Sequence, residues 1–181
     1  MRGITPEFAA SDGNGHIYNN LEDKNQVLQI DARTLQILNR WPLAPGESPS
    51  GMAIDAVNRR LFVGCRNRKL VVMNSDTGKV VTTVPIGEGV DANRFDPNTK
   101  VVFSSNGNGT LTVVHEDSAD AYSVIANVPT RRGARTMEFD PRTHRVYLVT
   151  AQLGPQPAQP HTPPPMVPGT FELLVFGRTS E

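Results

Sequence analysis

The sequence predicts an all-β fold, because one pattern of short apolar segments and polar turns recurs four times along the chain. In each copy an apolar stretch ends in an aspartate, and an aromatic residue follows six or seven positions later inside a second apolar run. These marker residues are Asp12, Asp55, Asp96 and Asp140, with Tyr18, Phe62, Phe103 and Tyr147. Self-similarity at ~40–45 residues, filled with short strands, is typical of β-propeller blades. We therefore predict a partial β-propeller of about four blades, forming a single domain over residues 1–181.

The first two repeats, residues 6–49 and 50–89, each contain four apolar runs separated by polar turns. In the second repeat the last turn ends in Gly78, a residue that takes the positive φ such turns need. The run after it is rich in β-branched residues, which favour strands. Four antiparallel strands of this kind make one blade. The predicted strands are 6–12, 15–19, 25–31 and 34–43, then 50–55, 61–64, 69–74 and 79–84.

The third and fourth repeats, residues 90–133 and 134–178, keep the same order of strands and turns. The predicted strands are 90–96, 100–105, 109–115 and 121–129, then 134–140, 144–150 and 171–176. Only three residues follow Arg178, so we expect the fourth blade to lack its outer strand. Closed rings usually carry ~4–8 blades, mostly toward the upper end, so we expect an open arc.

A proline-rich loop interrupts the fourth repeat. Residues 154–168 contain seven prolines among fifteen residues. Such density favours extended polyproline-like backbone and opposes regular sheet pairing. We expect a stiff surface flap or spacer; a ligand for a domain with an aromatic groove is the alternative.

Composition argues against several classes of partner. Eighteen basic residues balance eighteen acidic ones, so there is no electrostatic case for nucleic acid. No apolar run approaches the ~20 residues of a membrane span, and the first residues carry no apolar signal-peptide core. The single cysteine, Cys65, excludes an internal disulfide.

Several phrases of the sequence resemble the YVTN-type β-propeller proteins, the YncE-like family. The phrases are Asp76-Thr-Gly-Lys-Val80, Leu61-Phe-Val-Gly-Cys-Arg-Asn67, Asn106-Gly-Asn-Gly-Thr-Leu-Thr-Val113 and Arg132-Gly-Ala-Arg-Thr-Met137. Tyr147-Leu-Val-Thr150 is nearest to the family's signature, and residues 168–178 resemble its C-terminal end. The resemblance covers nearly the whole chain, and it is specific for the fold rather than for an activity.

The resemblance implies a roughly seven-bladed ring in the periplasm or at the cell surface, of which this chain would match the C-terminal blades. One expectation is a fragment of a larger exported ring, completed by the remaining blades. The other is a natural half-propeller that pairs with a second copy or another chain. In both cases the export signal is expected to belong to a part of the protein outside this sequence.

Propeller topology predicts which loops gather on one face. Loops between the second and third strands of a blade, and crossings from one blade to the next, emerge together around the channel mouth. Because rigid scaffolds commonly carry binding groups on such loops, we expect this face to bind a protein, a peptide or a small anionic ligand. The candidate ligand-binding residues are Asn20, Glu22, Glu47, Arg66, Asn67, Glu88, Asp91, Asn106, Arg131, Arg132 and Arg135.

Arginines give the sharpest local signal for such a ligand. Three of them lie within residues 131–135 at one crossing, and Arg66 lies on another loop of the same face. Guanidinium groups match carboxylates and phosphates through paired hydrogen bonds. If they bind an anion, the four should face one opening. The alternative is that they are solvated or pair with Glu88 and Asp91.

Other chemistries have weaker support. Glu47, Glu88 and Asp91 could offer oxygen ligands to a hard cation such as Ca²⁺, but no compact loop motif marks a site, so we predict no metal and no other cofactor. The four histidines are expected to lie too far apart for a metal cluster or a catalytic triad. Cys65 lies beside Arg66, where a cation could activate the thiol, but without a convergent histidine we expect it to be inert.

Two classes of function remain. We favour a non-catalytic binding or scaffold module, because the sequence offers no convergent set of metal ligands or nucleophile and base. The alternative is part of a propeller enzyme, either a lactonase-like hydrolase or a subunit of a quinone or haem oxidoreductase. The sequence lacks the Cys-x-x-Cys-His motif of covalently attached haem.

Overall fold

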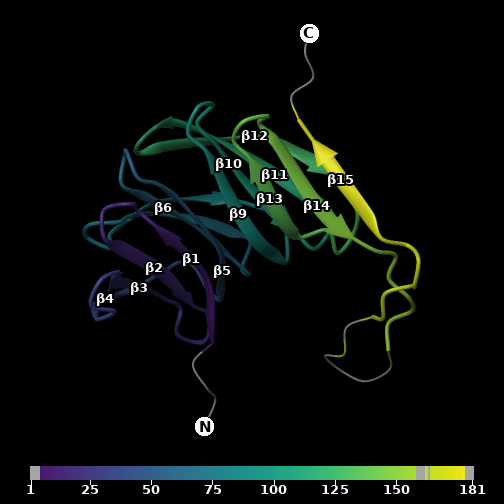
Figure 1. Cartoon of the computed structure of the whole chain (residues 1–181), viewed down its shortest axis with the longest axis horizontal. Helices are drawn as coiled ribbons and strands as arrows, with labels where there is room; N and C mark the ends of the chain where they lie inside the picture. The colour runs from purple at the N-terminus through teal and green to yellow at the C-terminus, as the bar shows by residue number, and fades with distance from the viewer. Residues whose placement is uncertain (1–4, 158–161, 163, 178–181) are drawn as a thin grey trace.

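The computed structural model describes residues 5–157, 162 and 164–177, and over these residues the chain is all-β. Its strands form four separate antiparallel sheets, three of four strands and one of three. Figure 1 shows the sheets following one another from the N-terminal end to the C-terminal end in an arc that does not close. The predicted fold class, a partial β-propeller, is therefore confirmed.

The first two sheets each run in simple up-and-down order from an inner to an outer strand. A single turn of 3-10 helix, η1 (Glu22–Lys24), follows β2. The strands of the first sheet are β1 (Pro6–Ser11), β2 (His16–Leu21), β3 (Gln26–Asp31) and β4 (Ile37–Pro42). Those of the second are β5 (Pro49–Asp55), β6 (Arg60–Cys65), β7 (Lys69–Asn74) and β8 (Val80–Pro85).

The third sheet repeats this order, and the fourth stops one strand short. Its last strand, β15, is a sheet edge within the described residues, as the sequence predicts. The strands of the third sheet are β9 (Val90–Asp96), β10 (Val101–Asn106), β11 (Thr110–Ser118) and β12 (Ala121–Pro129). Those of the fourth are β13 (Thr136–Asp140), β14 (Arg145–Thr150) and β15 (Glu172–Phe176).

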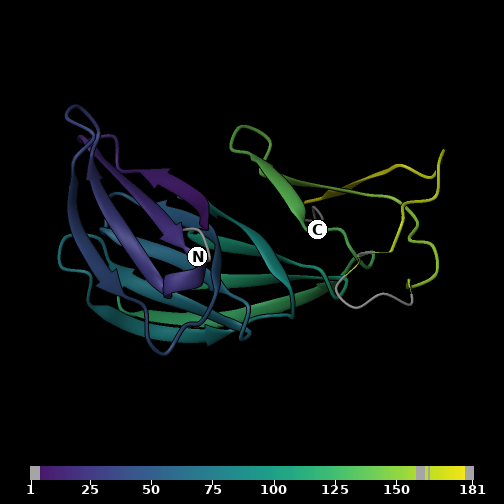
Figure 2. The ribbon, with the colours of Figure 1, turned by 90° about the horizontal axis from the view of Figure 1, so that it is seen from below.

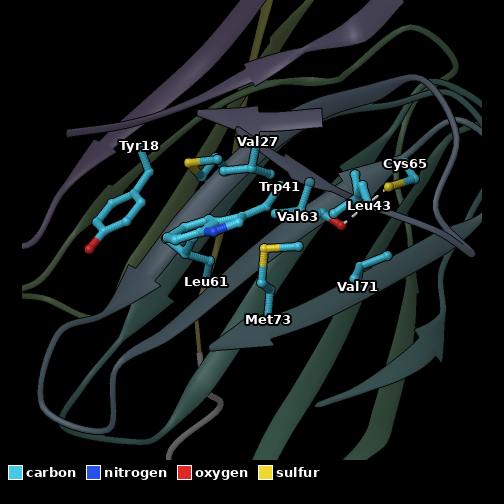
Figure 3. Close-up of a cluster of buried hydrophobic side chains, with 10 residues drawn as sticks. Tyr18, Val27, Trp41, Leu43, Leu61, Val63, Cys65, Val71 and Met73 are labelled. Atoms are coloured by element: carbon cyan, nitrogen blue, oxygen red, sulfur yellow. Dashed lines mark hydrogen bonds between the residues drawn. The ribbon is translucent and has the colours of Figure 1, made fainter. Parts of the chain in front are cut away.

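The hydrophobic core lies between neighbouring sheets, in three clusters. The middle sheets are covered on both faces, so β6 and β7 are buried at consecutive positions rather than at alternate ones. Figure 3 shows the cluster between the first two sheets, where Trp41 of β4 lies among Leu61, Val63 and Met73. Trp41 thus packs between two neighbouring sheets.

The four recurring aspartates cap the turn after each inner strand. Each accepts hydrogen bonds from backbone N–H groups of the turn; Asp55, for example, accepts from Val57 N at 2.9 Å and Asn58 N at 3.2 Å. The carboxylates of Asp96 and Asp140 also accept from threonine hydroxyls, at 2.6 and 2.7 Å. The aspartates therefore have a structural role, because every one satisfies donors of its own turn.

Backbone hydrogen bonds bring the predicted loops together on one face. Gly107 N, in the β10–β11 loop, donates to Gly89 O at 2.9 Å, and Gly107 O accepts from Gly133 N at the same distance. The loop between a second and a third strand is thus bonded to the crossings on both sides. We call this surface the loop-rich face.

The ends of the proline-rich loop pair with each other. Gly154 N donates to Pro165 O at 2.7 Å, and Val167 N donates to Gln152 O at 2.8 Å, around an antiparallel bridge between Leu153 and Met166. The described part of the loop thus contains no regular strand, as the sequence predicts, and its two ends are joined by one isolated bridge. Residues 158–161 and 163 lie outside the described part of the chain.

Seen from below in Figure 2, the fourth sheet diverges from the third, while the first three sheets stay closely layered. The third and fourth sheets meet mainly through their inner strands, β9 and β13. No helix in the described part of the chain is long and apolar enough to span a membrane.

Candidate functional site

One position of the repeat places four different side chains around the inner edge of the loop-rich face. Each residue lies five positions before a turn-capping aspartate; they are Glu7, Ser50, Asp91 and Arg135. In the first three sheets the pairing of the inner strand with its neighbour is irregular at this position. Such β-bulges commonly re-aim a side chain. We call these four residues the inner ring.

The inner ring and its neighbours carry charges of both signs. Arg135 Nε lies 3.8 Å from Asp91 Oδ1, and Arg66 Nε lies 2.9 Å from Glu22 Oε1. Burial raises the pKa of Glu7, the negative charges of Glu22 and Asp91 raise it further, and the charge of Arg66 opposes them. These charges therefore compensate one another at the inner edge of the loop-rich face, as the alternative interpretation of the arginines predicts for Arg135 and Asp91.

The sequence does not single out Glu7 or Ser50. Both lie within strands, where a polar residue is ordinary, and neither belongs to a loop. The signal that could have found them is their register in the repeat, because they occupy the same position as the predicted Asp91 and Arg135.

Three predicted asparagines connect loops and sheets. Asn20 is buried, and its Nδ2 donates to Ser50 O at 2.8 Å, which ties the first sheet to the second. Asn106 is buried and donates to Ser104 O and to the hydroxyl of Thr112, at 3.1 and 3.0 Å.

The third, Asn67, joins the β6–β7 loop to the preceding crossing. It accepts a hydrogen bond from Glu47 N at 3.2 Å and donates to Pro45 O at 2.9 Å. The side-chain amides of all three asparagines thus donate hydrogen bonds within the protein, so these residues stabilise the loop-rich face. Glu88 is exposed at the next crossing, where its carbonyl accepts from Asn108 N at 3.2 Å.

Arg131 and Arg132 line a cavity of about 330 Å³ between their crossing and the β14–β15 loop. We call it the arginine cavity. Arg131 Nε bonds to Glu172 Oε2 at 3.1 Å, whereas Arg132 is exposed and makes no ion pair with any described residue. Hydrogen-bonding side chains and apolar groups complete its wall. These residues are Thr150, Gln152, Leu153, Gln156, Pro164 and Glu172.

The four predicted arginines therefore divide between two places. Arg131 and Arg132 line the arginine cavity, while Arg66 pairs with Glu22 and Arg135 pairs with Asp91. The expectation that all four face one opening is wrong. Gly133, with a φ of +82°, lies between Arg132 and Arg135 in this crossing, and Arg135 beyond it pairs with Asp91.

Cys65 is fully buried between the first and second sheets. Burial raises the pKa of its thiol to about 12, so the neighbouring Arg66 does not activate it. Among the described residues, no three or more His, Cys, Asp and Glu side chains are grouped so that they could hold a metal ion.

Two histidines from different sheets line the same cavity. His115 at the end of the third sheet and His144 in the β13–β14 turn line one cavity between the third and fourth sheets. The sequence places them on different blades, and the turn that carries His144 reaches the third sheet, where His144 Nδ1 lies 2.7 Å from Asp96 Oδ2. His16 lies on the first sheet, and His161 is outside the described residues.

No protein-family model and no curated protein sequence matches the chain. Among solved structures, it is similar to a chain of Kuenenia stuttgartiensis hydrazine synthase, with a TM-score of 0.72 and 14% sequence identity. The match covers 86% of this chain and 46% of that one. The chain thus spans less than half the length of this structural neighbour. At this identity the comparison shows the fold, a β-propeller-like arc.

Proposed function

We propose that the chain is a non-catalytic β-propeller binding module whose arginine cavity takes a small ligand with a carboxylate or phosphate group. The observation that carries the proposal is the pair of adjacent guanidinium groups on the wall of one 330 Å³ cavity. Arg131 is oriented by Glu172, whereas Arg132 has no anionic partner among the described residues. A ligand anion would supply that partner.

The rest of the cavity wall suits a small organic anion. Its charged side chains are two guanidinium groups and one carboxylate, so the balance favours a negative ligand. Gln152 and Gln156 can hydrogen-bond to polar parts of the ligand, and Leu153 and Pro164 can contact apolar parts. Its volume lies at the small end of the ~300–1,000 Å³ common for ligand pockets.

We infer the finer assignment from sequence phrases alone. The phrases around Asp76-Thr-Gly78 and Asn106-Gly-Asn-Gly109 support membership of the YVTN-type, YncE-like family, and hence a periplasmic or cell-surface location. Further blades of a ring, or a second copy of this chain, are the partners that the open arc suggests. Hydrazine synthase is an enzyme by name, but 14% identity carries no activity across to this chain.

Isothermal titration with citrate and with inorganic phosphate tests the arginine cavity. We expect Arg132→Ala to weaken citrate binding about tenfold, because one charge-assisted contact is typically worth about 1.5–3 kcal/mol. Binding should also weaken as salt is added, since the site is open to solvent.

Arg59→Ala is the matched control. Arg59 is an exposed, ion-paired arginine in the β5–β6 turn, away from the loop-rich face, with its Nη1 2.9 Å from Asp76 Oδ2. Equal affinity in the wild-type protein and in Arg132→Ala would contradict the proposal. An equal loss in Arg59→Ala would show that only net charge matters.

A further inference from the structure

A second cavity, of about 380 Å³, lies between the third and fourth sheets, among the turns that follow the inner strands. It shares no residue with the arginine cavity. Its apolar wall comes from three consecutive strands of the third sheet and includes Ile125, which is 57% exposed. We call it the histidine cavity. The lining residues that carry the argument are Val101, Phe103, Val113, Ile125, His115 and His144.

Both histidines of this cavity are held in the same way. His144 Nδ1 lies 2.7 Å from Asp96 Oδ2, and His115 Nδ1 lies 2.7 Å from Asp117 Oδ1. A carboxylate accepts hydrogen bonds, so it fixes the proton on Nδ1 and leaves the lone pair of the neutral ring on Nε2. Each histidine side chain is about two-fifths exposed, and both line the cavity.

The two carboxylates are ionised at neutral pH. Burial alone would raise the pKa of Asp96, but hydrogen bonds from Thr99, His144 and the backbone together lower it. Hydrogen bonds from His115 and Ser123 lower the pKa of Asp117. A ligand in the cavity therefore meets an apolar surface, two hydrogen-bond acceptors and two nearby negative charges.

We propose that the histidine cavity binds a small neutral phenol. The aromatic ring of the ligand would contact Phe103 and the aliphatic wall, and its hydroxyl would donate to Nε2 of His144 or His115. An organic anion would be repelled by Asp96 and Asp117. A hydrocarbon without a hydroxyl would leave the two acceptors unpaired, which costs binding energy in an apolar site.

The test uses the 181-residue protein and three probes of similar shape: 4-ethylphenol, ethylbenzene and 4-ethylbenzoate. Dissociation constants come from amide chemical-shift titration by NMR, which also locates the contact. We expect 4-ethylphenol to bind at least tenfold more tightly than either other probe. The shifts should be confined to residues around Phe103 and Ile125.

Variants separate the histidines from the apolar wall. His115→Ala and His144→Ala should each reduce the preference for 4-ethylphenol over ethylbenzene several-fold. Ile125→Asp should weaken the binding of both probes. His16→Ala is the matched control, because His16 pairs with Asp12 at 2.8 Å but lies outside the cavity. His115 and Asp117 are both partly exposed, so His115→Ala keeps the test valid even if His144→Ala perturbs the fold.

Three results would overturn the proposal. One is equal binding of 4-ethylphenol and ethylbenzene to the wild-type protein, and another is tighter binding of 4-ethylbenzoate. The third is binding of zinc that requires both histidines and displaces 4-ethylphenol, which would make the pair a metal site. Failure of these tests leaves the arginine cavity unaffected, since the two sites share no residue.

Discussion

Glu116 carries a carboxyl group that is buried against the second sheet. Tyr122 OH donates to its Oε1 at 3.1 Å, while Oε2 has no hydrogen-bond partner among the described residues. Asn58 Nδ2 lies 2.7 Å from Asp55 Oδ2 and 3.5 Å from Glu116 Oε1, so two carboxyl groups share one amide donor. Burial, and then the negative charge of Asp55, raise the pKa of Glu116.

This raised pKa predicts a loss of stability at high pH. The folded-state pKa lies above the ordinary value of 4.5. The stability that the protonated acid contributes to the folded state is therefore fully present below pH 4.5. It is lost as the pH rises through the folded-state pKa. The Glu116→Gln side chain stays neutral at every pH. We therefore expect the stability advantage of this variant over the wild-type protein to grow by about 1–3 kcal/mol between pH 4 and pH 8, measured as the free energy of unfolding.

Urea denaturation at a series of pH values measures this difference. Glu138→Gln is the control with the opposite sign, because the hydrogen bond from Arg94 lowers the pKa of Glu138. Stability linked to Glu138 is present above the ordinary pKa of 4.5 and is lost as the pH falls through the folded-state value. If the difference in free energy of unfolding between the wild-type protein and Glu116→Gln did not change with pH, the interpretation of Glu116 as a buried acid would be contradicted.

Burial of Cys65 predicts that its thiol is unreactive in the folded protein. With a pKa of about 12, it is almost entirely protonated at pH 8, and the packed side chains around it block access. We expect an aromatic disulfide reagent to label the native protein at the rate of global or local unfolding, and to label the urea-unfolded protein within minutes. Rapid labelling of the native protein would show that the first two sheets separate readily.

At the scale of elements, the β7–β8 turn of the second sheet packs directly on the first sheet. Gly78 has a φ of +69°, and a Cβ added there would meet ring atoms of Trp41 at 2.1–2.3 Å. Gly78→Ala should therefore strain the turn and displace the indole, at a cost of about 1–3 kcal/mol in the free energy of unfolding. Trp41 is the only tryptophan, so its fluorescence reports the change.

Gly13→Ala separates the two effects of this substitution. Gly13 also has a positive φ, of +72°, but a Cβ there would meet nothing within 4 Å. This control should lose some stability with unchanged Trp41 emission. If both variants gave the same spectrum, the contact between the turn and the indole would have to be looser than the structure indicates.

Local signals explain which elements could be predicted from the sequence. The turn after each inner strand is specified by an aspartate and donors within four residues of it, so sequence inspection suffices. Glu7 and Ser50 were missed because polar residues within strands are ordinary, and only the bulges of the folded strands turn them toward the inner edge of the loop-rich face. That His115 and His144 line one cavity depends on how one sheet sits against another, which no local pattern encodes.

At the scale of the whole molecule, the outer face of the fourth sheet carries uncovered apolar side chains on its last two strands. Leu173 and Val175 are 53% and 49% exposed, and the register places Val149 and Tyr147 beside them on the same face. Leu174 and Phe176 point the other way, into the third core cluster. Sheet edges and apolar faces of this kind recruit other chains.

We therefore expect the 181-residue chain to associate at low micromolar concentration. Val175→Lys should shift the equilibrium toward monomer, because it places a charge on the uncovered face. Sedimentation velocity over a concentration series measures both effects, with Val57→Lys as a control at an exposed apolar residue of a turn. A sharp monomer at all concentrations, with cooperative unfolding, would show that four sheets suffice for a stable unit.

The contacts between sheets have a direction. The second strand of one sheet meets the inner strand of the next: Asn20 donates to Ser50 O, Asn93 to Phe62 O and Ser105 to Arg135 O. Each sheet thus offers different surfaces on its two sides, so two copies that used these contacts would join head to tail. Such heterologous contacts close into rings when the rotation per step allows it and otherwise grow into open filaments. The curvature of the arc would decide whether the copies form a closed ring with a fixed number of subunits or a filament of unlimited length.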